Sequence, residues 1–230
     1  MDRRLVWFFG LLVPVLGWSA VAPHDYFTWL LEVLPIFIGL PIALAVQRRF
    51  PLSSLLLGLL WWHSVILIVG GHYTYARVPL GDWAMSWFGW TRNNYDKLGH
   101  FTQGFVPAIL TREILLRTSP LKFGMHGSFG ASAAGGLALD NGLAPASRPS
   151  RWLPVLVVSV CLAFSAFYEL LEWVVAVWSG SAADDFLGTQ GYAWDTQTDM
   201  ALALVGAVAA LLLLAKAHDR SIARIVPCPA

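Results

Sequence analysis

Cysteine and charged residues are both scarce in this chain of 230 residues. Its two cysteines are Cys161, inside an apolar run, and Cys228, near the end of the chain. This placement argues against a disulfide framework and against a thiolate metal site. Charged residues make up 13% of the chain, against about a quarter in soluble proteins, and the formal net charge is +1. We therefore expect no basic surface for nucleic acid.

Apolar residues take the place of the missing charges. Hydrophobic residues make up 57% of the chain, and the mean hydropathy is +0.61. Several apolar segments of about 20 residues follow one another with short gaps, and each is long enough to cross a bilayer as a helix. The sequence predicts an all-α, polytopic membrane bundle that forms a single domain over residues 1–230. The six predicted spans lie near 5–21, 27–47, 52–76, 95–117, 153–178 and 195–216.

The positive charges predict the orientation of these spans. With the N-terminus inside, twelve of the 15 Lys and Arg residues fall on the inner face. The outer face keeps only Arg77, Arg92 and Lys97. Since positive loops stay in the cytoplasm, both termini are expected to be cytoplasmic.

Two connecting segments differ from the others. Residues 118–152 are rich in Gly, Ala, Ser and Pro, which predicts a flexible cytoplasmic loop. Residues 77–94 are predicted outside the membrane, and Trp83, Trp87 and Trp90 share one helical face there. This pattern is typical of a helix in the membrane interface. It favours a belt of anchors, with a lid over the outer end of the bundle as the alternative.

Ionisable residues inside the spans cost free energy and need a partner or a role. At about 1.5 Å per residue, most of them fall in the outer half of the membrane. Their spacings of three or four residues also place them on shared helix faces. We therefore predict one polar pocket that opens outwards, formed by Asp96, His100, Glu169, Glu172 and Asp199, with His72, Gln103, Asp195 and Gln197 as further candidates for its lining.

The carboxylates of this pocket cannot all be ionised together without compensation. Either some are protonated or a cation neutralises them. Carboxylates with imidazole are ligands for divalent metals, so a divalent cation is predicted, with no organic cofactor. The predicted metal ligands are Asp96, His100, Glu169, Glu172 and Asp199, and the predicted catalytic residues are His100, Glu169 and Glu172.

Simpler structural roles compete with this interpretation at several positions. Asp96 and Asp195 each stand at the start of a span, where they equally well predict helix caps. His63, apart from the cluster, is expected to be a hydrogen-bonded packing residue. Glu113 and Arg117 have the spacing of a routine helix ion pair. Lys97 is expected to point away from the pocket towards the outer headgroups.

Four segments carry a family resemblance: "GGHYTYARVPLG" (70–81), "RNNYDKLGHFTQGFVPAILTREILLR" (92–117), "FSAFYELLEW" (164–173) and "FLGTQGYAWDTQTDM" (186–200). Together they resemble the YjdF-like family of bacterial inner-membrane proteins. The resemblance implies a multi-pass protein of the bacterial inner membrane and no particular activity.

A pattern of fewer residues resembles the VanZ-like proteins, which are linked to glycopeptide-antibiotic tolerance. It consists of "DKLGHF" (96–101), Glu169 or Glu172, and "DMALALVG" (199–206). This chain has Ala203 or Leu204 where those proteins often carry an Asn, so it departs from their pattern in the last span.

These residues support three hypotheses about function. The first is a metal-dependent hydrolase or transferase that acts on a lipid or lipid-linked substrate at the periplasmic leaflet. The second is a proton-coupled transporter, because membrane carboxylates also form proton relays. The third is a structural or regulatory membrane protein whose polar cluster only holds the bundle together. The bilayer is the only partner that the sequence predicts directly.

Overall fold

The structure is a computed structural model that describes residues 3–119, 150–180, 184–187 and 189–225. The loop predicted over 118–152 lies almost wholly outside these residues. The described residues are helical and contain no strand, which confirms the predicted all-α membrane fold.

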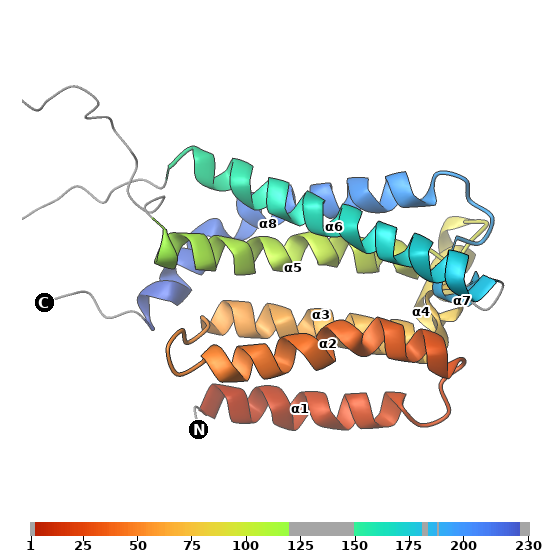
Figure 1. Cartoon of the computed structure of the whole chain (residues 1–230), viewed down its shortest axis with the longest axis horizontal. Helices are drawn as coiled ribbons and strands as arrows, with labels where there is room; N and C mark the ends of the chain where they lie inside the picture. Colours follow the sequence, from red (N-terminus) through yellow and green to blue (C-terminus); the bar gives the residue numbers. More distant parts are fainter. Residues whose placement is uncertain (1–2, 120–149, 181–183, 188, 226–230) are drawn as a thin grey trace, which may run out of the picture.

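Six long helices run back and forth along the molecule (Figure 1). They are α1 (Arg3–Ser19), α2 (Tyr26–Val46), α3 (Ser54–Tyr73), α5 (Tyr95–Thr118), α6 (Trp152–Ser179) and α8 (Asp195–Ala223). Each covers one of the predicted spans. α3 ends three residues early because Thr74 has a positive φ of 57°. α8 runs seven residues past the predicted end, through a polar segment that packs against the bundle.

Three short helices lie together at one end of the bundle, which we call the α4 end. They are the 3₁₀-helix η1 (Tyr75–Arg77), α4 (Pro79–Phe88) and α7 (Asp184–Leu187). Figure 1 shows α1, α2 and α3 in one half of the molecule and α5, α6 and α8 in the other. Packing of α3 against α5 joins the two halves.

α5 is the central helix and the least apolar of the long ones. α2, α3, α6 and α8 are long and apolar enough to cross a membrane by length and composition, and α1 is a shorter apolar helix. α5 is not apolar enough to count among these membrane-spanning candidates, but α3, α6 and α8 all pack on it. A helix surrounded by protein does not need an apolar surface, so α5 can carry the polar residues of the bundle.

Small residues bring α5 and α8 very close together. A Cβ atom at Gly104 would lie 1.8 Å from the carbonyl oxygen of Ala203, and one at Gly206 would lie 2.1 Å from that of Phe101. Ala203 and Ala207 are fully buried between the helices. Such contacts of glycine and alanine are the usual means of close packing between membrane helices. They place the start of α8 beside the start of α5.

A buried polar network fastens the opposite end. The fully buried Glu113 accepts hydrogen bonds from the Ser53 backbone N–H at 2.9 Å and from Arg117 Nη1 at 2.8 Å. Its other oxygen lies 2.9 Å from His218 Nε2. Arg112 Nη1 donates to His218 Nδ1 at 3.1 Å, so the ring proton sits on Nε2. The predicted Glu113–Arg117 pair is confirmed, within a network that joins α3, α5 and α8.

Candidate metal and substrate site

The start of α5 is held in place by Asn93. Its side-chain amide donates to the Val78 carbonyl at 2.9 Å and to Asp82 Oδ1 at 2.8 Å, while its Oδ1 accepts from the Tyr95 backbone N–H at 3.1 Å. Asn93 thus ties α5 to α4 and satisfies a backbone donor of the first turn. Because this role is filled, the Asp96 side chain is available to face the interior of the bundle.

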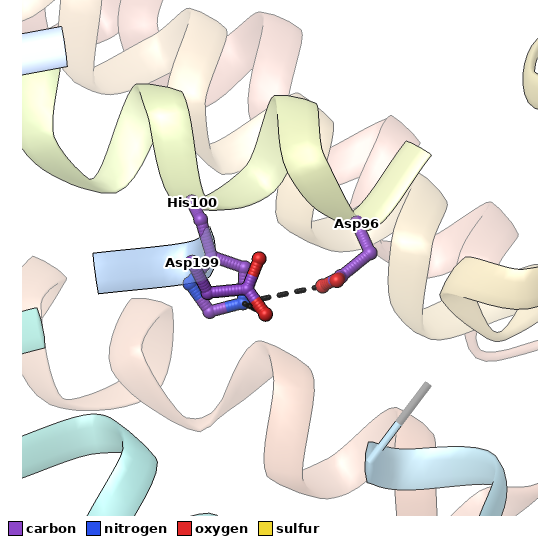
Figure 2. A group of neighbouring side chains, drawn as sticks. All are labelled: Asp96, His100 and Asp199. Carbon is purple, nitrogen blue, oxygen red and sulfur yellow. Dashed lines mark ion pairs between the residues drawn. The ribbon is translucent and has the colours of Figure 1, made fainter. Parts of the chain in front are cut away.

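His100 lies between two carboxylates from different helices (Figure 2). Its Nε2 is 3.2 Å from Asp96 Oδ1, one turn earlier on α5, and 3.8 Å from Asp199 Oδ2 on α8. One potential ligand atom from each of the three residues lies within 4.8 Å of the others. All three side chains are buried. The structure therefore brings together three of the five predicted metal ligands.

The other ring nitrogen of His100 fixes its orientation. Nδ1 lies 2.9 Å from Gln103 Oε1 and 3.6 Å from Glu169 Oε1, and both are acceptor oxygens. Nδ1 therefore carries a proton, and Nε2 is left to face the two aspartates. A metal-ligating histidine is usually held in this way, with its second nitrogen donating to an oxygen. The same arrangement also suits a protonated, ion-paired imidazole.

Lys97 contradicts its prediction. Instead of pointing to the outer headgroups, its Nζ lies 2.6 Å from Asp195 Oδ1 and 2.6 Å from Asp199 Oδ1. Arg92 Nη1 lies 2.9 Å from the same Asp195 oxygen. The Asp195 carboxylate therefore joins α5 to α8 by ion pairs. It serves as an ion-pair partner rather than as the cap of α8. Asp199 keeps its second oxygen, Oδ2, towards His100.

The two glutamates of α6 lie at different places in the site. Glu169 is buried beside His100, and its Oε1 has no hydrogen-bond partner among the described residues. Glu172 is partly exposed one turn further along α6 and lines a cavity. Glu169 is thus a candidate base next to the His100 cluster, whereas Glu172 belongs to the wall of the space in front of it.

This cavity has a volume of about 60 Å³. A buried water needs roughly 10–15 Å³ by the same kind of measure, so the cavity has room for a few waters or a small chemical group. Its lining combines acidic, amide and imidazole groups with aromatic and apolar side chains. The lining consists of Glu32, Pro35, His63, Leu67, Tyr75, Asp96, Gly99, His100, Gln103, Phe164, Tyr168, Glu172 and Phe186.

Glu32 on α2 is the main residue that sequence reasoning missed. It is 4% exposed and lines the cavity, as Tyr75 does. Burial and the nearby Glu32 carboxylate raise the pKa of Tyr75 well above its usual value, so the phenol remains a donor. The signal was present in the sequence, because Glu32 is a lone carboxylate within an apolar span.

Three of the residues predicted as further lining, His72, Asp195 and Gln197, do not line the cavity. His72 packs on Trp18, with ring centroids 4.4 Å apart, and its Nδ1 lies 3.0 Å from the Ser19 carbonyl oxygen. Gln197 is exposed, on the side of α8 away from Asp195 and Asp199. His63, expected to be a hydrogen-bonded packing residue, instead lines the cavity, and its Nε2 lacks a partner among the described residues.

The comparison with known proteins decides the family. The sequence matches the family described as "Predicted membrane protein (DUF2238)" over residues 4–220. The chain belongs to this family. It is also 45% identical to "Inner membrane protein YjdF" of Escherichia coli (strain K12) over 213 residues, which are 93% of this chain and 90% of that protein. No solved structure matches the chain.

Membership confirms the predicted YjdF-like resemblance and the location in the bacterial inner membrane. The resemblance to VanZ-like proteins stays a prediction. An inner-membrane location also explains the many large apolar side chains on the surface, among them Trp83 and Trp87 of α4, which are 61% and 81% exposed. Neither lines the cavity, and the belt of anchors stays a prediction.

Proposed function

We propose that this protein is a metal-dependent hydrolase or transferase that acts on a lipid or lipid-linked substrate in the outer leaflet. The observation that carries the proposal is the convergence of Asp96, His100 and Asp199 beside a cavity in the bundle. A divalent cation bound there would polarise a substrate oxygen and activate a water.

One of the two separations from His100 to a proposed ligand oxygen fits a shared cation, and the other is about 0.4 Å longer than the upper value expected for ligands of one metal. Ligands about 2.1 Å from one metal, at tetrahedral or octahedral angles, lie about 3.0–3.4 Å from one another. The distances from His100 Nε2 to Asp96 Oδ1 and Asp199 Oδ2 are 3.2 and 3.8 Å. Lys97 contacts the other oxygens of these aspartates, so its ammonium neutralises charge without filling the space between the ligands.

Glu169 is the residue that we assign as general base. It is buried, its Oε1 is unpartnered among the described residues, and it lies 3.6 Å from His100 Nδ1. A carboxylate at this position can accept the proton of an attacking water held at the cluster. Glu172 lies outside this cluster, so we do not assign it as a metal ligand.

Proton-coupled transport receives less support from the described residues. Between Gln103 and the network at the opposite end, the buried residues of α5 include Val106, Ala108 and Ile109, all with no exposed surface. These side chains belong to the apolar core or pack beside it, and they offer no proton relay along α5. The polar cluster therefore suits a reaction at one leaflet better than passage across the membrane.

An activity measurement tests this proposal. The purified protein is incubated with inner-membrane lipid extract, with and without a chelator, and the products are followed by mass spectrometry. We expect a lipid product that disappears with the chelator and with Glu169→Gln, and that persists with the exposed control Gln197→Asn. Turnover that survives both the chelator and Glu169→Gln would contradict the proposal.

A further inference from the structure

The charge of the cavity wall shows what kind of group it accepts. Three carboxylates, Glu32, Asp96 and Glu172, come from three different helices, and the described lining contains no Lys or Arg. The nearby cations are engaged by carboxylates: Lys97 by Asp96, Asp195 and Asp199, and Arg92 by Asp195. Asp96 is paired with Lys97 and His100, whereas Glu32 and Glu172 have no Lys or Arg ion-pair partner among the described residues, so the space in front of these two glutamates offers carboxyl groups to a cation. A cationic group would be attracted to it and an anionic group repelled.

Aromatic rings surround the same space. Tyr75 from η1, Phe164 and Tyr168 from α6 and Phe186 from α7 all line the cavity. Aromatic faces combined with carboxylates are the means by which proteins hold alkylated ammonium groups, because the ring quadrupole attracts the cation. Neither a hydrated metal ion nor a phosphate needs these aromatic lining residues. The lining therefore fits an ammonium group better than it fits either of those ligands.

Two of the helices that line the cavity do not pack extensively on each other. α2 supplies Glu32 and Pro35, and α6 supplies Phe164, Tyr168 and Glu172. Over the part of the chain that the structure describes, α2 packs mainly on α3, whereas α6 packs on α5 and α8. Phe164 lines the cavity and is still 48% exposed, so this part of the cavity wall also reaches the molecular surface.

The exposed surfaces of α2 and α6 are apolar. Leu34 on α2 and Phe167 on α6, which neighbour the lining residues in sequence, are 41% and 55% exposed. The short helix α7 contacts both α2 and α6 and places the buried Phe186 against the cavity at the α4 end. Access from the side, where lipid surrounds the bundle, fits these surfaces better than access along the axis from water.

We propose that the cavity binds the ammonium headgroup of a membrane amphiphile that enters between α2 and α6. Glu32 and Glu172 pair with the cationic group, and the aromatic rings enclose its alkyl substituents. The inference rests on the proposed function, in which this amphiphile is the substrate and the Asp96–His100–Asp199 cluster is the neighbouring reactive centre. It names the class of substrate that the proposed function left open.

Calorimetry on metal-free protein in a neutral maltoside detergent tests this inference. The probes are dodecyltrimethylammonium, dodecyl phosphate with the same chain, and tetramethylammonium as the headgroup alone. We expect dodecyltrimethylammonium to bind at least tenfold more tightly than either of the others. Equal binding of dodecyl phosphate would overturn the cationic headgroup, and equal binding of tetramethylammonium would overturn entry from the membrane.

Variants locate the binding site. Glu32→Gln and Glu172→Gln are each expected to weaken dodecyltrimethylammonium binding at least tenfold. Asp219→Asn makes the same change of charge at the opposite end, on a side chain that is 53% exposed, and should leave binding unchanged. Glu172 is partly exposed, so its variant remains informative even if Glu32→Gln fails to fold. Equal weakening by Asp219→Asn would show nonspecific charge attraction and contradict the site.

The same variants separate this inference from the metal proposal. Asp199→Asn is expected to remove the metal and to keep ammonium binding. Glu172→Gln is expected to keep the metal and to weaken ammonium binding. Because the calorimetry uses metal-free protein, ammonium binding without any metal affinity would sink the metal-dependent enzyme and leave the ammonium site standing. Metal binding without selectivity for ammonium would overturn the ammonium site and leave the metal-dependent enzyme standing.

Discussion

Substitution of Gly206 by alanine is expected to damage both the stability and the site. The added Cβ would lie 2.1 Å from the Phe101 carbonyl oxygen, a backbone atom that cannot swing away. Ordinary contact begins at 3.4 Å, so α5 and α8 must separate locally by about 1.3 Å, the difference of these distances. Overpacking of this kind costs about 1–3 kcal/mol.

This separation reaches the proposed metal ligands. Asp199 lies on α8 about two turns before Gly206, whereas Asp96 and His100 lie on α5. Metal-ligand distances tolerate errors of about 0.2 Å, far less than the expected shift. We therefore expect Gly206→Ala to weaken metal binding at least tenfold, in addition to its effect on unfolding.

Thermal unfolding in detergent and metal titration measure the two effects. The matched control is Gly58→Ala on α3, where an added Cβ meets no atom within 4 Å. In an open helical position alanine is favoured over glycine by roughly 0.5–1 kcal/mol, so this control should be neutral or stabilising. If Gly206→Ala unfolds at the same temperature as Gly58→Ala, the close packing of α5 and α8 is not as described.

Three further predictions concern other parts of the chain. Lys97→Met leaves Asp199 without its ammonium partner and should lower the free energy of unfolding by about 3–5 kcal/mol. Excess divalent metal should recover part of this loss. An unchanged free energy of unfolding would contradict the ion pairs. His218→Ala removes a partner from both Glu113 and Arg112 and should cost a similar amount in thermal unfolding, whereas full stability would show that the network is unimportant. Trp87→Ala should change stability by less than about 0.5 kcal/mol but reduce the quenching of tryptophan fluorescence by brominated lipids.

The long helices could be predicted from the sequence because a bilayer demands apolar segments of fixed length. The pairing of Asp96 with His100 could also be predicted, since residues four apart share one helix face. The rotation of one helix relative to another could not. His72 lies near the membrane depth expected for the pocket, but its side chain faces α1. Its depth in the membrane therefore wrongly placed it in the pocket.

For two other residues the sequence pattern itself contains the information that corrects the prediction. Gln197 lies two residues from both Asp195 and Asp199, which puts it on the opposite side of a helix. Glu32 is a carboxylate inside an apolar span and belonged among the candidates from the start. Lys97 is different, because its contacts with Asp195 and Asp199 depend on how closely α8 approaches α5, and that distance is set by Gly104 and Gly206.

Metal content per protein is the most direct test of the proposed site. The measurement is mass spectrometry on the detergent-purified protein, with the wild type beside Asp199→Asn and the exposed control Gln197→Asn. The proposal predicts near-stoichiometric divalent metal in the wild type and in Gln197→Asn, and its loss in Asp199→Asn. Absence of metal from all three after purification and titration with divalent cations would contradict it, and His100 would then be an ion-paired imidazolium between Asp96 and Asp199.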